Sequence, residues 1–350
     1  MKIFFNLLIY CILFFFSYNL LANNIYDTNF YHINLETNNV KKTKFNQIEK
    51  IKIESFNKIL DKILTKENKK TLIREINYND IFNQIIKNII IDNEKIKKKK
   101  YIADIKVFFD KQEIIKLLRN SKINYSDFYS DNHLIISSYT GLFTNSGLSK
   151  ENPFYKYDNI KNIDFDNLLI KFIKPDLTPN DRYIVPYNKI IKRDLKTLHG
   201  IGKKYKNNSI FLINIKELNN NLVVNIYFYS LINNKINLID NIKIDKTSNF
   251  QIIIINHLNN WWKVKNEVNN SLLNELICTF VSNDYYELQS LKSEIQNLSQ
   301  FKSMSIQKIS YNNNIEKIQF YGDYKLFKIN LFKKGIKLSN NENCIINKIK

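Results

Sequence analysis

Hydrophobic positions along the chain change their spacing several times, and each change predicts a new element. In the first part, apolar residues alternate in some segments and recur every three to four residues in others. The expected elements are strands at 26–35, 89–96 and 101–109 and helices at 45–64 and 81–86. Asp110 precedes a further helical run, and its carboxylate can accept the free amide bonds of a first helical turn. Residues 23–124 are therefore expected to form a small α/β domain.

A second region, 125–268, has many short strands and few helices. Asparagines separate several of the strands, at 219–221 and 233–234, and such runs suit turns that need positive φ. The expected strands are 134–139, 168–173, 209–215, 221–231 and 235–244, and the expected helices are 190–205 and 249–264. This pattern predicts a mixed-sheet middle domain.

The third region, 269–350, has the clearest order. The expected elements are a strand at 272–281, a helix at 284–298, a hairpin at 301–321, a helix at 323–334 and a strand at 336–349. The order βαββαβ is that of the ferredoxin-like fold. The fold class is therefore α+β, with several small mixed-sheet domains and a ferredoxin-like one at the C-terminal end.

Cys278 and Cys344 lie on the first and last expected strands of this third domain, which are neighbours in a ferredoxin-like sheet. A disulfide needs Cα atoms within about 7 Å and a matched register. We expect two free buried thiols, and a Cys278–Cys344 disulfide is the alternative.

The N-terminal residues 1–22 have the pattern of an export signal. Lys2 supplies a positive charge, an apolar run follows, and Ala22 precedes polar residues. We expect cleavage after Ala22 and a periplasmic protein. The alternative is an uncleaved membrane anchor, because the apolar run nearly reaches the roughly 20 residues that span a bilayer. Cys11 lies inside the apolar run, so no lipid attachment is expected.

Composition adds size and charge to this picture. The 350 residues are 44% hydrophobic and 25% charged, which is typical of folded domains. The net charge of +20 would suit nucleic acid or a membrane surface, but only four of the 53 basic residues are arginine. Base readout and phosphate clamping favour arginine. We therefore expect no nucleic-acid partner and keep an anionic lipid surface as an alternative.

No group of residues in the sequence predicts a reaction. The four histidines are far apart, without the spacing that places two imidazoles on one metal ion; they are His32, His133, His199 and His257. The serines lack the G-x-S-x-G turn that exposes a nucleophile. We expect no catalytic residue, no cofactor and no metal. Of the two tryptophans, Trp261 and Trp262, we expect one to face the core and the other the rim.

Several short motifs resemble a known family. The segment 101–110, YIADIKVFFD, is followed by Leu117-Leu118-Arg119, and later by Leu142-Phe143, Asn152-Pro153-Phe154 and Tyr321-Gly322-Asp323. Together they resemble the bacterial family known as domain of unknown function 2066. In this sequence phenylalanine stands at both positions where that family has tryptophan in its Leu-Trp and Asn-Pro-Trp motifs.

The resemblance implies an exported protein of the Gram-negative cell envelope with no established reaction. More distantly, the first two domains are similar to exported assembly factors such as flagellar assembly protein T. We therefore predict a non-catalytic protein-binding or assembly module with an envelope protein as partner. Its predicted interaction loop holds Leu142, Phe143, Asn152, Pro153 and Phe154. The alternative is a ligand-binding protein or hydrolase with a concave site near the loop 141–157.

Overall fold

The computed structural model describes residues 25–349 except 98, 157–166, 310–313 and 342. The expected export signal, 1–22, lies outside the described residues. The chain forms two compact units: one contains the residues up to Leu60 and Glu75–Leu117, and the other contains Asp61–Arg74 and Leu118–Lys350. Each of the three expected domain ranges holds one β-sheet, but the second and third sheets share a compact unit. The division at 124 and 268 stays a prediction.

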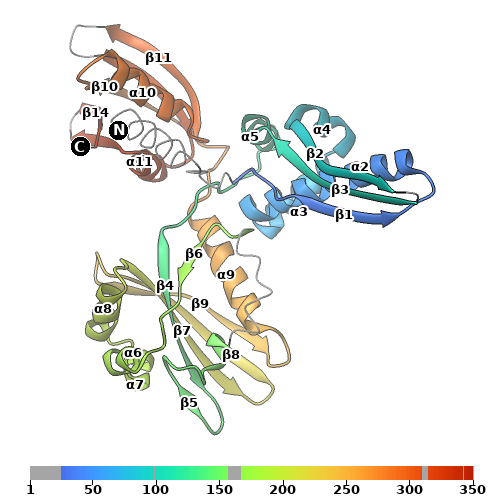
Figure 1. Ribbon diagram of the computed structural model, residues 1–350. Helices are drawn as coiled ribbons and strands as arrows, with labels where there is room; N and C mark the ends of the chain where they lie inside the picture. Colours follow the sequence, from blue (N-terminus) through green and yellow to red (C-terminus); the bar gives the residue numbers. More distant parts are fainter. Residues whose placement is uncertain (1–24, 98, 157–166, 310–313, 342, 350) are drawn as a thin grey trace, which may run out of the picture. The chain divides into compact units, whose positions relative to one another are not determined.

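The first unit is built on a three-stranded antiparallel sheet with the order β1-β3-β2 (Figure 1). Its strands are β1 (Tyr31–Glu36), β2 (Ile86–Lys97) and β3 (Lys100–Phe109). Its helices are α4 (Tyr78–Ile85) and most of α2 (Val40–Ile63) and α5 (Lys111–Asn120), whose last residues belong to the other unit. Every second residue of β3 is buried, and Phe109 lies 5.9 Å from the ring of Phe56 on α2. Asp110 accepts a hydrogen bond from the Gln112 amide at 2.8 Å, so the expected helix cap is confirmed.

The second sheet has the order β5-β4-β7-β8-β9, and β6 pairs with β4. Its strands are β4 (Asn132–Thr140), β5 (Asn145–Ser146), β6 (Lys171–Ile173), β7 (Ser209–Leu218), β8 (Asn221–Ser230) and β9 (Lys235–Asp245). Strand β4 runs parallel to β6 and β7, and the other pairs are antiparallel. Residues 133–139 of β4 are all buried, which indicates that both faces of the sheet are covered there.

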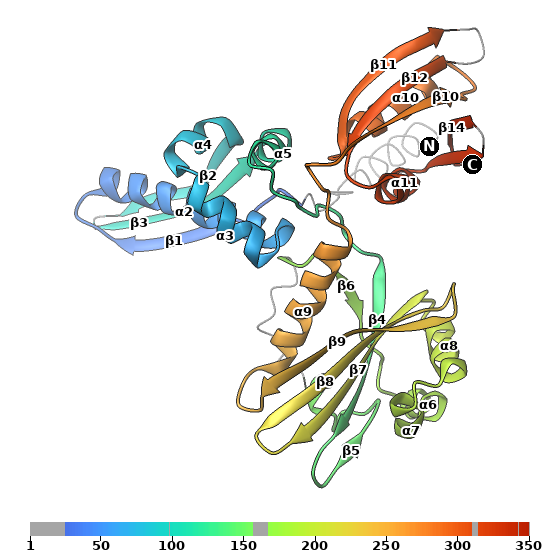
Figure 2. The same cartoon turned by 180° about the vertical axis from the view of Figure 1, so that it is seen from behind.

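Helices cover this sheet from two sides. Helix α9 (Phe250–Lys265) lies on one side, and α6 (Pro179–Ile184), α7 (Tyr187–Ile191) and α8 (Leu195–Lys204) lie on the other (Figures 1 and 2). The single helix expected at 190–205 is wrong, because Arg193 takes a positive φ of 55° and Asp194 caps a new helix. Helix α3 (Lys66–Glu75) was not expected, since it is strongly charged and Leu72 is its one buried residue.

The third sheet has the order β11-β12-β10-β14-β13. Its strands are β10 (Leu273–Phe280), β11 (Phe301–Ile309), β12 (Asn314–Tyr321), β13 (Ile336–Asn341) and β14 (Asn343–Lys348). Helices α10 (Tyr285–Gln296) and α11 (Tyr324–Lys333) share one apolar core with it, so the domain is ferredoxin-like as expected. The expected final strand, 336–349, is instead a hairpin of β13 and β14, and the element order is βαββαββ.

A disulfide joins Cys278 on β10 to Cys344 on β14. The two strands are parallel neighbours with these residues in register, and the Cα atoms are 4.5 Å apart. Both side chains are buried in the core beneath the helices. The expectation of free thiols was therefore wrong, and the alternative of a bridge is the one found.

Among the described residues, no helix combines the length and the apolar character needed to cross a membrane.

Candidate functional site

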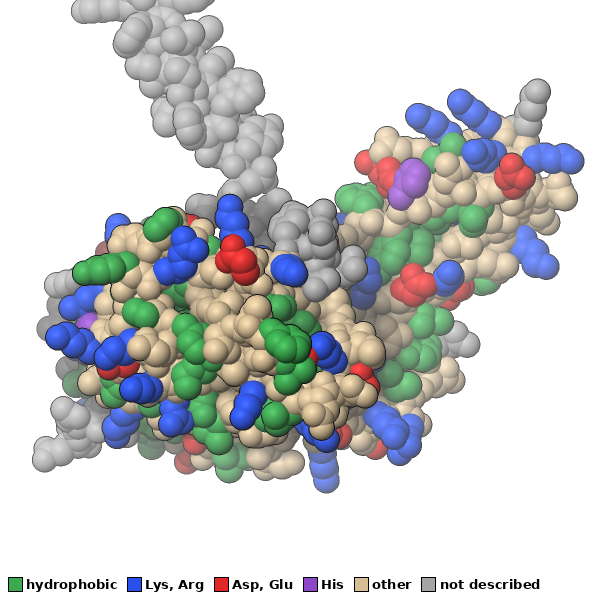
Figure 3. Space-filling view, turned by 90° about the horizontal axis from the view of Figure 1, so that it is seen from below, with side chains coloured by type: hydrophobic (Ala, Val, Ile, Leu, Met, Phe, Trp, Pro, Cys, Tyr) green, Lys and Arg blue, Asp and Glu red, His purple; other side chains and the backbone are tan. Residues whose placement is uncertain are grey.

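The most exposed aromatic side chain of the predicted interaction loop lies at the turn between β4 and β5. Residues Gly141–Thr144, here called the hairpin tip, close this turn, and Gly141 N–H donates to the Thr144 carbonyl at 2.8 Å. Phe143 is 97% exposed and Leu142 is 63% exposed. Seen from below Figure 1, the side toward which this hairpin points, the surface carries hydrophobic side chains in several groups between lysines (Figure 3).

Glu217 on β7 makes polar contacts at the base of the hairpin tip. The Glu217 carboxylate accepts a hydrogen bond from the Tyr139 hydroxyl at 2.9 Å, and it forms an ion pair with Lys246. The Lys246 and Tyr139 contacts hold the pKa of Glu217 below its usual value. Burial, together with the bond to Glu217, raises the pKa of Tyr139 to about 12. The turn therefore presents an apolar tip on a rigid polar base.

The second half of the predicted interaction loop is part of the core. The Asn152 side chain is fully buried and donates to the carbonyls of Ser137 (3.1 Å) and Gly147 (2.9 Å). Its own carbonyl accepts the Phe154 amide at 3.0 Å and caps a short helix, Pro153–Tyr155. Phe154 is 1% exposed. Asn152 and Phe154 are therefore buried residues that anchor the loop, and Pro153 between them is partly exposed. A role of these three residues in partner contact stays a prediction.

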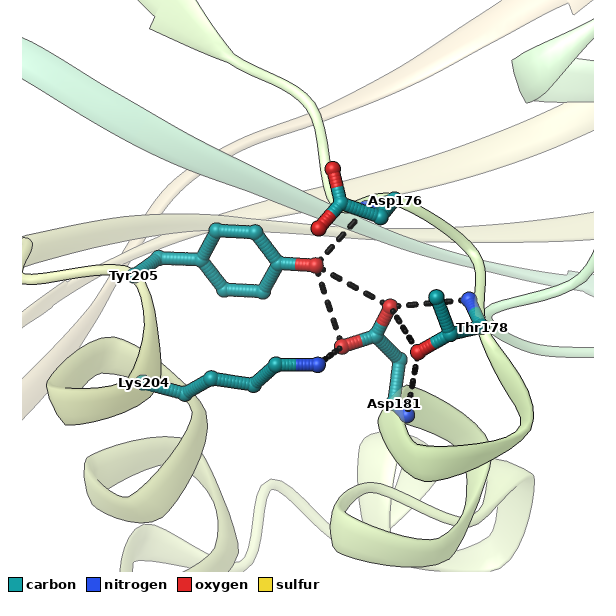
Figure 4. Close-up of polar contacts among 5 residues, drawn as sticks. All are labelled: Asp176, Thr178, Asp181, Lys204 and Tyr205. Carbon is teal, nitrogen blue, oxygen red and sulfur yellow. Dashed lines mark hydrogen bonds and ion pairs between the residues drawn. The ribbon is translucent and has the colours of Figure 1, made fainter.

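A buried carboxylate that we did not single out from the sequence lies between α6 and α8. Asp181 is fully buried, and Thr178 gives it both its amide N–H (2.9 Å) and its hydroxyl (3.1 Å) (Figure 4). Lys204 Nζ lies 2.6 Å away, and the Tyr205 hydroxyl lies 3.0 Å from each carboxylate oxygen. Burial raises the pKa of Asp181, but these bonds together hold it below its usual value. Both carboxylate oxygens of Asp181 have hydrogen-bond partners, so the cluster connects α6 to the C-terminal end of α8.

His133 on β4 is the buried histidine of the same sheet. Its Nδ1 lies 2.6 Å from the Ser209 hydroxyl, and its ring centroid lies 4.9 Å from that of Phe211 and 5.6 Å from that of Trp262. Burial lowers its pKa to about 4, so the ring is neutral at pH 7. No described residue pairs with Nε2, which is also buried. A histidine beside a serine suggests acyl chemistry, but this ring is only 4% exposed.

The two tryptophans belong to the aromatic cluster around His133. Trp262 is 8% exposed and donates its indole N–H to the Phe128 carbonyl at 3.0 Å, whereas Trp261 is half-buried against Phe228. The expectation of one tryptophan in the core and one at the rim is confirmed. In the part of the chain that the structure describes, no three His, Cys, Asp or Glu side chains meet in a group that could hold a metal ion.

Comparison with protein-family models, with curated proteins and with solved structures finds no match to this chain. The resemblance to domain of unknown function 2066 therefore stays a prediction based on the short motifs.

Proposed function

We propose that this protein is an exported, non-catalytic binding module of the bacterial cell envelope and that the hairpin tip contacts its protein partner. The observation that carries the proposal is the 97% exposure of Phe143 on a turn that the Gly141–Thr144 backbone hydrogen bond closes. Aromatic residues contribute a large share of binding energy at protein interfaces, and a fixed backbone lowers the entropy that binding costs. The polar anchor of the turn thus favours a role in recognition.

The disulfide supports the exported location. Disulfides persist in oxidising compartments, of which the periplasm is one, and they are rare in the bacterial cytosol. Cys278 and Cys344 are the two cysteines that remain if the leader is cleaved after Ala22, and the structure pairs them. Pairing and leader together favour export by a cleaved signal into the periplasm.

Site-specific photocrosslinking in intact cells tests the proposed contact. A photoreactive amino acid would replace Phe143, and in a matched control it would replace Phe45, which is 63% exposed in the other compact unit. We expect one envelope protein to be crosslinked at position 143 and not at position 45, and to be lost in a Leu142→Ala variant. Crosslinking of nothing at position 143, or of the same proteins at both positions, would overturn the proposal. Phe154→Ala is unsuitable as a binding variant because that ring is core.

The ligand-binding or hydrolase alternative predicts a site near the loop 141–157. Neither of the two cavities described here, one over α11 and one between α3 and α9, is lined by residues of that loop. The exposed tip therefore favours the binding module over this alternative.

Binding to an anionic lipid surface is a second candidate, because one groove has suitable chemistry. A cavity of about 830 Å³ lies over α11 and β13, and its lining includes Lys325, Lys328 and Lys337. Its wall includes Phe332, which is 65% exposed. Cations beside an exposed apolar ring are typical of membrane-surface contacts. Co-sedimentation with phosphatidylglycerol vesicles that 0.5 M salt abolishes, and that Lys325→Gln with Lys328→Gln weakens, would favour it.

A further inference from the structure

A cavity of about 690 Å³ lies between α3 and α9, and all of its described lining belongs to the second compact unit. Ligand pockets typically have volumes of about 300–1,000 Å³ and are partly apolar with a few polar groups. Leu64, Leu168 and Ile252 contribute the apolar part here. The cavity therefore has the size and the mixed lining of a small-molecule site.

One wall of the cavity is a row of cations. Lys66, Lys70 and Arg74 line it from α3, and their spacing of four residues places them on one face of that helix. Successive members of the row are separated by a rise of about 6 Å along the helix axis. Among the described residues, no carboxylate forms an ion pair with any of the three. Asp61, which also lines the cavity, pairs with Lys69 at 2.7 Å.

The opposite wall is a row of amides on α9. Asn256 and Asn260 line the cavity four residues apart, and both are exposed. Each amide group offers two N–H donors that can bind the oxygens of an anion. Asn259, also on this wall, is committed, because its side-chain carbonyl accepts the Leu169 amide at 2.9 Å. A ligand in the cavity would thus meet cations on one side and hydrogen-bond donors on the other.

The two walls are held in place by hydrogen bonds. Lys263 of α9 is 7% exposed and donates to the Leu64 carbonyl at 2.8 Å and to the Asp61 carbonyl, at the end of α2. The Ser126 amide donates to the Ile63 carbonyl at 2.9 Å, and the Asn68 side chain donates to the Asn124 carbonyl at 2.9 Å. These bonds fix the segment that carries the cation row, so the cavity exists before any ligand binds.

We propose that this cavity binds a small polyanion carrying two or more phosphate groups. Three cations without carboxylate partners, set along about 12 Å of one helix, match several anionic groups better than one. The opposing amides add hydrogen bonds to the same oxygens. The volume of the cavity fits a small molecule rather than a nucleic-acid duplex.

Isothermal titration calorimetry with inorganic tripolyphosphate tests the site on the chain that begins at residue 23, in 150 mM salt. We expect tripolyphosphate to bind at least 10-fold more tightly than orthophosphate. Lys66→Gln, Lys70→Gln and Arg74→Gln together should weaken binding at least 10-fold. The matched control, Lys41→Gln, Lys42→Gln and Lys87→Gln, removes the same charge from exposed side chains of the first unit and should change affinity less than 2-fold.

Two further variants separate a built site from general charge attraction. Asn256→Ala with Asn260→Ala should weaken tripolyphosphate binding about 3- to 10-fold while net charge is unchanged. Tryptophan fluorescence checks that the variants fold, because Trp261 and Trp262 lie on the same helix as the amide row. The proposal would be overturned if the variant of the cation row and the lysine control lost the same affinity for tripolyphosphate. Equal affinity for tripolyphosphate and orthophosphate would also overturn it. Phe143→Ala should leave this binding unchanged, so the site and the hairpin tip are tested separately.

Discussion

The second and third sheets stabilise their interiors in different ways. The second sheet and its helices contain buried groups that can gain or lose a proton, such as Asp181 and His133. The third sheet also buries one carboxylate, Glu316 on β12, beside Lys292. It has in addition a covalent bond, Cys278–Cys344, between two neighbouring strands. The comparison teaches that acid should weaken the second sheet, through Asp181 and His133, and that reductant should weaken the third sheet. The stability of the second sheet can be measured separately by tryptophan fluorescence, because Trp261 and Trp262 both lie on α9.

The largest expected effect is loss of the disulfide. It closes a loop with a sequence separation of 66 residues, for which the chain-entropy model gives a stabilisation of about 4 kcal/mol. Reduction, or Cys278→Ala with Cys344→Ala, should lower the midpoint of a urea transition followed by far-ultraviolet circular dichroism. Tryptophan fluorescence should keep its midpoint. An equal shift of both signals would break the comparison and show that the two sheets unfold together.

The next effect is expected at Asp181. Asp181→Asn removes the charge that Lys204 and Tyr205 bind, and breaking a buried ion pair costs about 3 kcal/mol or more. Tryptophan fluorescence should show a lower urea midpoint, whereas exposed Asp80→Asn should show little change. Because the pKa of folded Asp181 is lowered, its contribution is present above the unfolded pKa near 4 and is lost as pH falls through the folded value. A variant as stable as the unmodified chain would contradict a stabilising role.

The effect of His133 on stability should appear at a higher pH than that of Asp181. Its folded pKa of about 4 lies below the unfolded value near 6.5, so the unfolded chain binds the extra proton first. Stability from this group is complete above pH 6.5 and falls as pH drops toward 4, by about 2 kcal/mol between pH 7.5 and pH 5.0. His133→Gln should remove this pH dependence of the fluorescence midpoint. His199→Gln, as a control, should keep it, and a pH dependence that survives in His133→Gln would assign it to another group.

The smallest effect on stability is expected at the hairpin tip. Leu142→Ala and Phe143→Ala remove side chains that are already in water, so the free energy of unfolding should change by less than about 0.5 kcal/mol. Urea titration followed by tryptophan fluorescence measures this change. A clear loss of stability would show that Phe143 packs against the protein in solution. The hairpin tip would then not be an exposed surface.

The sequence was most informative where spacing alone decides the structure. Strands β7, β8 and β9 alternate and are separated by asparagine turns, and Asn219 and Asn234 do take positive φ. Helix α3 was missed because a charged helix with one buried leucine has little apolar spacing to detect. Apolar spacing predicts one strand where the hairpin of β13 and β14 lies, although its asparagines, at 340, 341 and 343, are also typical of a turn.

The candidate sites depended more on contacts between distant residues. Phe143 and Phe154 are the same residue type in one loop, so only the folded chain shows that one is exposed and the other is core. The Thr178–Asp181 capping box can be read from the sequence, but its partner Lys204 comes from a later helix. Pairing of the cysteines likewise depends on strand register, which residue types do not determine.

The bond between the first and final strands of the C-terminal sheet also determines how this part of the chain responds to a pulling force. Tension applied at the two ends of the sheet passes from Cys278 to Cys344 through the sulfur atoms, and the chain between them carries no load. With a separation of 66 residues, about 240 Å of extended length stays unavailable until the bond is reduced. A partner that pulls on this protein would therefore meet a short, stiff tether in oxidised cells and a long, compliant one after reduction.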